Sequence, residues 1–401
     1  MNIFLGIIVG LLILMLLIIV HELGHFLAAI KNGVEVEEFA IGFPPAALKW
    51  QKNRKGKWTR IPRKDWSKLD PKKMVFSLNW LPIGGFCKMK GESDDDKRPH
   101  SFGRASLWQK TKILFGGVIF NFLAAVVIFT ILAWTGMPIF IDNQFQIAAD
   151  SRAGTVGHVV AVSVEADSPA AAAGLEVGDE ILVLADETIT SAPQIIELTK
   201  AHSGEDIALT YARDDQITET TVTLLEPTAD RTWVFGVTSA QVERYYSTWS
   251  APLVGVGTTV QLTGETFRGI GSMLYNFLSG VFRQISPDGQ VREEGRAAIG
   301  AAGDGLTGPV GIVGMIFPAF MDTGLTNLAF LAAIISISLA CMNVLPIPAL
   351  DGGRWSLISF YRLRKKTLGK ATEERIVSRA FIVLLGLILL ITVLDITRFF
   401  K

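Results

Sequence analysis

The sequence predicts a polytopic α-helical membrane protein with four transmembrane helices, a cytoplasmic membrane-associated β-hairpin and one α+β domain outside the membrane. Three observations predict this fold class. Of the 401 residues, 49% are hydrophobic and only 19% are charged, four long segments carry almost no charge, and the charges between these segments are segregated by sign. Such an apolar composition is typical of membrane proteins. We find no nucleic-acid-binding motif and expect no nucleic-acid partner.

Four segments are predicted to cross the bilayer. They lie in residues 1–31, 113–134, 323–353 and 380–401, the last with an apolar core at 380–394. The regions between them are predicted to be a cytoplasmic loop with the β-hairpin at 32–112, a linker at 135–152, a folded domain at 153–226, a post-domain region at 227–322 and a second cytoplasmic loop at 354–379. The first segment is long enough to cross about 30 Å of hydrocarbon with some tilt.

Two of these assignments have alternatives. A cleaved signal peptide is the alternative for the first span, but "MNIFLGIIVG" lacks the basic residues that precede the apolar run of such a peptide. The stretch 305–320 is uncharged, yet its four glycines and two prolines favour a re-entrant or interfacial segment over a fifth span. A fifth span there would also place the acidic domain and the basic loop at 354–379 on the same side of the membrane.

Charge segregation predicts the orientation. Basic residues outnumber acidic ones by nineteen to nine in 31–112 and by eight to two in 354–379, whereas 135–326 has nine basic and twenty-four acidic residues. The positive-inside rule therefore places the two basic loops in the cytoplasm, with the acidic domain and both termini outside. We expect a multi-pass membrane protein in contact with the lipid bilayer.

The first span contains the motif H-E-x-x-H, formed by His21, Glu22 and His25. On a helix the two histidines lie one turn apart on one face, where their imidazoles can bind Zn²⁺ while the glutamate serves as general base. A non-metal polar cluster is the alternative. Ionisable groups in hydrocarbon cost a few kcal/mol each, however, and a metal ion would offset that cost. We therefore predict a metal site.

A third ligand is expected from the end of the third span, "MNVLPIPALDGG". Pro346 and Pro348 cannot continue a regular helix, and irregular backbone at membrane depth is tolerated where it lines a cavity or is buried in protein. Asp351 follows this break and Asn343 precedes it. His21 lies about 27 Å along the first span, which runs inward, and is therefore close to the cytoplasmic boundary. The third span also runs inward, so Asp351 at its end is expected at the same depth.

Together, the H-E-x-x-H and N-x-x-P-x-P-x-x-D-G motifs resemble those of the site-2 protease family of intramembrane zinc metalloproteases, and most closely its bacterial branch. The resemblance covers nearly the whole chain, including "GGVIFN" and "GGFCKMKGE". It implies His21, His25 and Asp351 as zinc ligands and Glu22 as catalytic base. It also implies that two asparagines, Asn343 and Asn121, hold substrate near the metal.

The sequence departs from the family pattern at two places. Pro44 stands where the family has the second glycine of G-F-G, and Val118 stands where a proline is common. Neither position is a predicted zinc ligand, so the departures concern loop and substrate-path details rather than the chemistry.

The first cytoplasmic loop contains β-type residues in "KWTRIPR" and "MVFSLNWLPIGGFCKMKGE". One interpretation is a solvated or membrane-lying hairpin, and the other is an edge strand that pairs with an unwound substrate. The family resemblance implies the second role for five consecutive residues: Gly85, Phe86, Cys87, Lys88 and Met89.

The external domain, residues 153–226, is expected to contain four short strands and a helix at 191–202. Its "SPAAAAGLEVGDEIL" resembles a PDZ-domain signature, with Gly174 and Gly178 in turns and Asp179 opening a strand. Such domains bind peptides by strand addition, and the groove is expected along Thr155, Val156, Gly157, His158, Val159 and Val160. A size filter over the active site is the alternative role. The stretch 258–282 looks amphipathic and is expected to lie on the outer membrane face or against this domain.

The predicted function is that of an intramembrane zinc metalloendopeptidase that cuts transmembrane segments of single-span membrane proteins. The resemblance implies the second cut in regulated proteolysis, of an anti-sigma factor or of remnant signal peptides. A non-catalytic membrane scaffold that recruits partners through its PDZ domain is one alternative. A metal or proton transporter is another, although the second and fourth spans contain almost none of the polar residues that transport requires.

Overall fold

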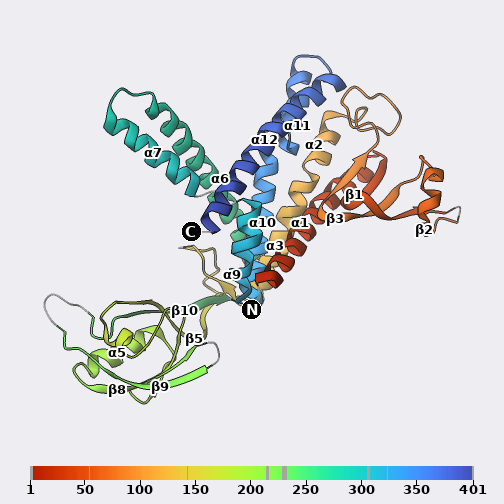
Figure 1. Ribbon diagram of the computed structural model, residues 1–401. Helices are drawn as coiled ribbons and strands as arrows, with labels where there is room; N and C mark the ends of the chain where they lie inside the picture. The colour runs from red at the N-terminus through yellow and green to blue at the C-terminus, as the bar shows by residue number, and fades with distance from the viewer. Residues whose placement is uncertain are drawn as a thin grey trace. The chain divides into compact units, whose positions relative to one another are not determined.

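Four long apolar helices dominate the computed structural model of the protein (Figure 1). The structure describes residues 3–53, 55–141, 143–213, 216–227, 233–304, 308–322 and 324–399. It divides into two compact units, Gly136–Thr248 and the remainder, which are considered separately below. The apolar helical segments are α1 (Ile3–Lys31), the pair α2 (Leu107–Leu114) and α3 (Gly116–Thr135), α10 (Leu325–Val344) and α12 (Lys370–Phe399). They coincide with the four predicted spans, and each is long and apolar enough to cross a membrane.

The helix of the third span ends where the two prolines predicted a break. After α10 ends at Val344, the chain is irregular through residue 350, and α11 (Asp351–Leu363) then begins at the predicted ligand. A Cβ on Gly352 would lie 2.1 Å from the carbonyl oxygen of Val344, and one on Gly353 would lie 1.9 Å from that of Ile347. The two glycines therefore allow α11 to fold back tightly onto the irregular segment, which fixes the position of Asp351.

Helices α1 and α3 cross with almost no side chain between them. A Cβ on Gly24 would lie 2.2 Å from the carbonyl oxygen of Gly116, and one on Gly116 would lie 2.6 Å from that of Gly24. Small residues at such crossings allow helix backbones to approach closely. The close approach brings the H-E-x-x-H turn of α1 directly against the first turn of α3.

A three-stranded sheet, with two long strands and one short strand in the order β2–β1–β3, follows α1 (Figure 1). The strands are β1 (Val36–Lys52), β2 (Trp58–Ile61) and β3 (Val75–Met89). Both long strands fold back at their middles, so residues 38–41 of β1 pair with 85–88 on one side and with 75–78 on the other. This places 85–89 at the edge of the sheet. Our sequence analysis missed β1, because Pro44 and Pro45 in its centre are typical of a loop.

The stretch predicted to be re-entrant or interfacial, 305–320, is helical over its described part. It comprises α8 (Pro309–Gly311), a π-helical turn η2 (Ile312–Ile316) and α9 (Phe317–Asp322). Buried Phe317 and the adjacent Pro318 pack against Gly10 and Gly6 of α1, where a Cβ would come within 2.7 Å. About fourteen residues of helix extend only ~21 Å, too short to cross the hydrocarbon core.

Helix α6 (Ala251–Gln284) contains the stretch 258–282 that the sequence predicted to be amphipathic. Its first third is buried against α3, where a Cβ on Gly255 would lie 2.8 Å from the carbonyl oxygen of Val126. The helix then continues and forms a hairpin with α7 (Gly289–Asp304). The first third therefore makes a helix–helix contact through small residues, and the placement of 258–282 on the outer membrane face or against the PDZ-like domain stays a prediction.

The second unit is an antiparallel sheet with strand order β4–β10–β5–β6–β8–β9 and two helices (Figure 1). Its elements are β4 (Met137–Pro138), β5 (Arg152–Val164), α4 (Pro169–Ala172), β6 (Glu180–Leu184), β7 (Glu187–Thr188), α5 (Ala192–Ala201), β8 (Asp206–Arg213), β9 (Gln216–Thr223) and β10 (Val237–Tyr246). The expected strands and helix are present. The unit is larger than the predicted 153–226, because β10 pairs along β5 although it lies beyond that range.

Two further details of this unit bear on our predictions. Gly174 and Gly178 have positive φ, as expected for turn residues, and the carboxylate of Asp179 accepts hydrogen bonds from Arg213 at 2.7 Å. The Arg213 guanidinium holds the pKa of Asp179 below its usual range. Within the predicted peptide groove, which stays a prediction, Val159 and Val160 pair with β6, while β10 pairs along the other side of β5. No free strand edge is left there, and the side chains of 155–158 lie outside the described part.

Candidate metal centre

The three predicted ligands meet in one place, although His21 and Asp351 lie 330 residues apart in the sequence. His21 Nε2 lies 3.1 Å from Asp351 Oδ2 and 3.1 Å from His25 Nε2, and His25 Nε2 lies 3.3 Å from Asp351 Oδ2. The side chains are largely buried, with exposed fractions of 12%, 9% and 21% for His21, His25 and Asp351. Helix α1 supplies the two imidazoles, and the first residue of α11 supplies the carboxylate.

This triangle of donor atoms fits zinc. Zinc–nitrogen and zinc–oxygen bonds of about 2.0–2.1 Å in a tetrahedron place ligand atoms ~3.3–3.4 Å apart, close to the observed separations. Two imidazole nitrogens and one carboxylate oxygen are ligands that zinc accepts. They leave the fourth position open, as catalytic zinc sites require. No other group of three such side chains was found among the described residues.

The imidazole of each histidine contacts a polar group through its other nitrogen. His25 Nδ1 lies 2.8 Å from the carbonyl oxygen of Ile113, so Nδ1 carries the proton and Nε2 is free for a metal. His21 Nδ1 lies 3.4 Å from the side-chain amide of Asn121, which is fully buried and whose Oδ1 has no hydrogen-bond partner. With the amide turned over, Oδ1 would accept the Nδ1 proton of His21.

Gly117 of α3 forms the floor of the site. A Cβ at this position would lie 2.6 Å from Cε1 and 2.7 Å from Nε2 of His21, and also 2.7 Å from Nε2 of His25. Only glycine leaves room for both rings. Sequence analysis did not identify this residue as functional, although two adjacent glycines at the start of an apolar span were the available signal.

Glu22 faces a cavity of about 510 Å³ that also contains the three predicted ligands. The cavity is lined by the edge of β3, by Asn343 and by the start of α11. The Glu22 carboxylate lies against the backbone N–H of Cys87, and Gly85 lies beside its Cγ. Burial, together with the nearby Glu22 and Glu92 carboxylates, raises the pKa of the Cys87 thiol to about 12. The thiol is therefore neutral at pH 7.

The predicted substrate residues occupy different places. Phe86, Cys87, Lys88 and Met89 line the cavity with Asn343, whose side-chain amide donates to the carbonyl oxygen of Leu339 at 3.0 Å. Asn121 instead lies on the α3 side of His21 and is not among the residues that line the cavity.

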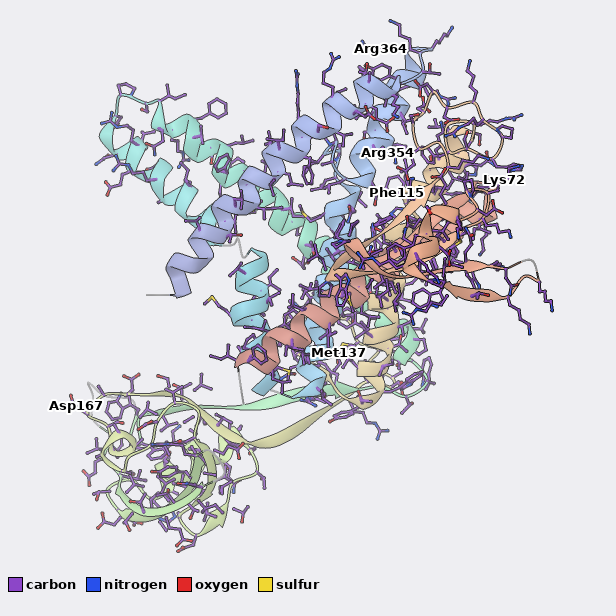
Figure 2. All side chains as sticks on the ribbon, turned by 45° about the vertical axis from the view of Figure 1, so that its right-hand side comes forward. Lys72, Phe115, Met137, Asp167, Arg354 and Arg364 are labelled. Atoms are coloured by element: carbon purple, nitrogen blue, oxygen red, sulfur yellow. The ribbon has the colours of Figure 1, made fainter. Side chains whose placement is uncertain are left out.

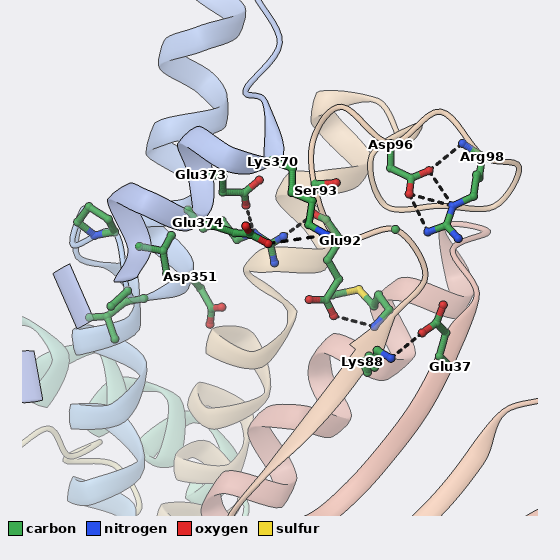
Figure 3. Close-up of a pocket in the computed structure, with 17 residues that line it drawn as sticks. Glu37, Lys88, Glu92, Ser93, Asp96, Arg98, Asp351, Lys370, Glu373 and Glu374 are labelled. Atoms are coloured by element: carbon green, nitrogen blue, oxygen red, sulfur yellow. Dashed lines mark hydrogen bonds and ion pairs between the residues drawn. The ribbon is translucent and has the colours of Figure 1, made fainter. Parts of the chain in front are cut away.

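A second cavity, of about 720 Å³, is drawn in Figure 3. It adjoins the first, and Arg354 lines both. Arg354 follows Asp351 by one helical turn. Its guanidinium donates to the carbonyl oxygen of Glu92 and, at 2.9 Å, to the carboxylate of Glu373. Glu92 in turn accepts the backbone N–H of Met89 at 2.9 Å. The end of the edge strand is thus tied to the helix that begins with Asp351. We did not identify Arg354 from sequence, because its partners come from distant segments.

The apolar helices and the His–His–Asp donor set together define a membrane-embedded zinc metallopeptidase. Residues 9–62 and 64–388 match the profile of peptidase family M50, and the chain belongs to that family. It is a zinc metalloprotease of the site-2 protease type, and Zn²⁺ is its cofactor.

Curated relatives match over almost their whole length, and each is described as "Putative zinc metalloprotease". The Nostoc sp. protein is 28% identical over 96% of this chain and 94% of its own. The Clostridium acetobutylicum protein is 27% identical over 98% of both chains, and one from Helicobacter pylori strain 26695 is 30% identical over 90% of both. Among solved structures, the PDZ domain of an SdrC-like protein from Listeria monocytogenes matches 22% of this chain and 92% of that one. Its identity is 24% and its TM-score is 0.20.

Proposed function

We propose that this protein hydrolyses peptide bonds inside the transmembrane segments of single-span membrane proteins, with His21, His25 and Asp351 as zinc ligands and Glu22 as general base. One observation carries the proposal: the compact His–His–Asp triangle opens, beside Glu22, into a cavity lined by a strand edge. A transporter would need a polar path across several helices. A protease needs ligands for a metal, a base and a place for extended substrate, and residues suited to all three roles lie together here.

When bound, zinc supplies a Lewis acid that acidifies water and polarises a carbonyl group. Glu22 would take the proton from the attacking water and give it to the leaving amine. Its neighbours on α1 are the ligands themselves, so the base and the metal are held on one rigid turn. The Ile113 carbonyl oxygen orients His25, and the amide of Asn121 would orient His21 in the same way.

The edge of β3 would bind the substrate. Residues 85–88 pair with β1 on one side only, and the other side faces the cavity. A transmembrane helix keeps its amides in internal hydrogen bonds, and these must break before a carbonyl can reach the metal. An edge strand replaces the lost bonds by strand addition. Asn343, on the opposite wall, would hold the substrate backbone near the metal.

The location of the cut follows from the charge pattern. Basic loops at 32–112 and 354–379 belong in the cytoplasm by the positive-inside rule, so the site would lie near the cytoplasmic face of the bacterial inner membrane. The acidic domain would then lie outside and act as a size filter that admits substrates shortened by an earlier cut. Such substrates include anti-sigma-factor-like proteins and remnant signal peptides.

The test combines zinc analysis with cleavage of a single-span substrate in liposomes, for the wild type, Glu22→Gln and Asp351→Asn. We expect about one zinc per chain in the wild type and in Glu22→Gln, with cleavage lost in the latter. Asp351→Asn should lose zinc and cleavage together. Cleavage by Glu22→Gln at the wild-type rate would refute its role as base. Bound zinc with zinc flux but without cleavage would favour the transporter.

A further inference from the structure

One end of the β1–β3 sheet carries a concentrated positive charge. Between Lys49 and Lys73 the sequence contains eleven basic and two acidic residues. Both acidic residues are paired within the segment: Asp65 contacts Lys68 at 2.8 Å, and Asp70 contacts Lys73 at 3.7 Å. The exposed basic side chains that form no ion pair within the described part of the chain are Lys52, Lys55, Lys57, Arg60, Arg63, Lys64 and Lys72. We call residues 49–73 the basic end.

Of the three tryptophans in the basic end, Trp58 and Trp66 lie beside cationic side chains. Trp58 is 42% exposed, packs edge-on against Phe76 at 4.8 Å between ring centroids, and has the ammonium of Lys52 5.5 Å from its own centroid. Trp66 donates its indole N–H to the carbonyl oxygen of Ile61 at 3.1 Å and lies beside two more cationic side chains. Tryptophan beside basic residues is the composition of a membrane–water interface.

A cavity of about 370 Å³ opens at the basic end. Two lysines, an asparagine and the exposed tryptophan contribute to its lining, which consists of Lys52, Asn53, Gly56, Trp58, Lys73 and Met74. Ammonium groups and an amide around a concavity are suited to an anionic oxygen cluster such as a phosphodiester. The Trp58 ring offers an apolar wall for the adjoining glycerol and acyl carbons.

The opposite end of the sheet is apolar, which orients the basic end. Phe43, Trp80 and Leu81 are all exposed there, Trp80 by 69%. Leu81 and Val75 lie six residues apart on β3, about 20 Å at ~3.3 Å per residue. Half of the hydrocarbon core is about 15 Å thick. If the apolar end is immersed, the basic end therefore lies at the level of the headgroups. Only residues 32–35 separate β1 from α1, so the sheet stays within reach of the bilayer.

From these four observations we propose that the basic end is a binding site for the headgroups of anionic phospholipids, which holds the sheet on the cytoplasmic leaflet. Bacterial anionic lipids such as phosphatidylglycerol carry the complementary charge. In the view of Figure 2 the sheet extends away from the helices, with the labelled Lys72 in the turn that precedes β3. Because the edge strand belongs to the same sheet, lipid binding would set its depth. The proposal does not depend on proteolysis.

The test places the full-length protein in nanodiscs that contain phosphatidylcholine alone or mixed with phosphatidylglycerol bearing a nitroxide near its headgroup. The readout is the quenching of Trp58 fluorescence by the nitroxide. The Trp58 signal is the difference in emission between each protein and the same protein with Trp58→Phe. We compare the wild type with a triple variant, Lys52→Gln/Lys55→Gln/Lys57→Gln. A matched control carries the same charge change at the α11–α12 corner: Arg364→Gln/Lys365→Gln/Lys366→Gln. Circular dichroism checks the fold of every variant.

We expect strong quenching for the wild type and the control. The apparent affinity for the labelled lipid should fall about tenfold or more in the basic-end variant, since each basic residue near an anionic surface contributes substantially to binding. The quenching should also weaken in about 1 M salt, where the Debye length falls to about 3 Å. Equal quenching by nitroxide-labelled phosphatidylcholine would overturn the proposal. So would displacement of the labelled lipid by a soluble oligonucleotide, which would instead indicate a nucleic-acid surface.

Discussion

Gly117 lies so close to His21 that a single methyl group on it would come within 2.6 Å of the imidazole ring. The zinc site thus depends on the absence of a side chain from a helix that contributes no ligand. Gly117→Ala should displace both histidine rings and lower the zinc content well below one per chain, with loss of cleavage. Gly386→Ala is the control, because a Cβ at Gly386 meets nothing within 4 Å. A Gly117→Ala protein with full zinc content would contradict this prediction.

Asn121 is expected to act through His21 rather than through substrate. Replacing a group that orients a metal-bound histidine commonly lowers metal affinity 10–100-fold, about 1.4–2.7 kcal/mol. We therefore expect Asn121→Leu to lower zinc affinity in this range, as measured by competition with a chelator. If zinc affinity is unchanged and only KM rises, Asn121 contacts the substrate, as the family resemblance implied.

Arg354 joins the edge strand to the helix of Asp351 through Glu92. Hydrogen bonds to charged groups contribute about 1.5–3 kcal/mol, so Arg354→Gln should loosen the strand and raise KM for a model substrate ~10-fold or more. Zinc content should stay near one per chain, because no zinc ligand is touched. Arg364→Gln, on the exposed end of the same helix, is the control. Loss of zinc from Arg354→Gln would show that the contact supports the metal site instead.

The first basic loop is fixed to the helices by a buried ion pair between Asp94 and Lys110, both with side chains 0% exposed. Removing one partner of a buried pair typically costs about 3–5 kcal/mol. Asp94→Asn should therefore lower the unfolding temperature in detergent markedly, whereas Asp96→Asn, in an exposed pair, should change it little. Equal unfolding temperatures for the two variants would refute the structural role of the pair.

The same pair predicts a pH dependence of stability. Burial alone would raise the pKa of Asp94, but Lys110, the backbone N–H of Leu368 and Arg362 hold it below its usual range. A carboxyl group whose pKa is lower in the folded state stabilises the fold above its unfolded pKa, about 3.9. This stabilisation is lost as the pH falls below that value, through the folded-state pKa. The wild type should lose stability there more steeply than Asp94→Asn, in thermal melts at matched pH.

Features that depend on local sequence were predictable. The four spans follow from long uncharged runs, and the break before Asp351 follows from Pro346 and Pro348, which cannot continue a helix. The candidate ligand set could be proposed because two of its members, His21 and His25, share one helical turn. The third member, Asp351, follows the helix break and was expected at the same membrane depth as His21.

Features that depend on the approach of distant segments were not predictable. The place of β10 in the sheet is set by pairing with β5, more than seventy residues earlier in the chain. Strand β1 was missed because Pro44 and Pro45, where it folds back, are typical of a loop. The strand forms because β2 and β3 pair with it. Gly117 and Arg354 gained their importance only from neighbours on other helices. A resemblance to a PDZ signature correctly indicated turns at Gly174 and Gly178, but not the pairing that occupies both sides of Val160.

The separation of His21 and Asp351 along the chain has a consequence for biosynthesis. At about 5–20 residues per second, a ribosome needs roughly 15–70 s to make the 330 residues between them. Throughout that time the nascent chain carries two of the three proposed zinc ligands and cannot complete the candidate site. A chain that stalls before α11 is therefore harmless to the membrane proteins inserted beside it. Proteolytic competence appears only after nearly nine-tenths of the polypeptide has been translated.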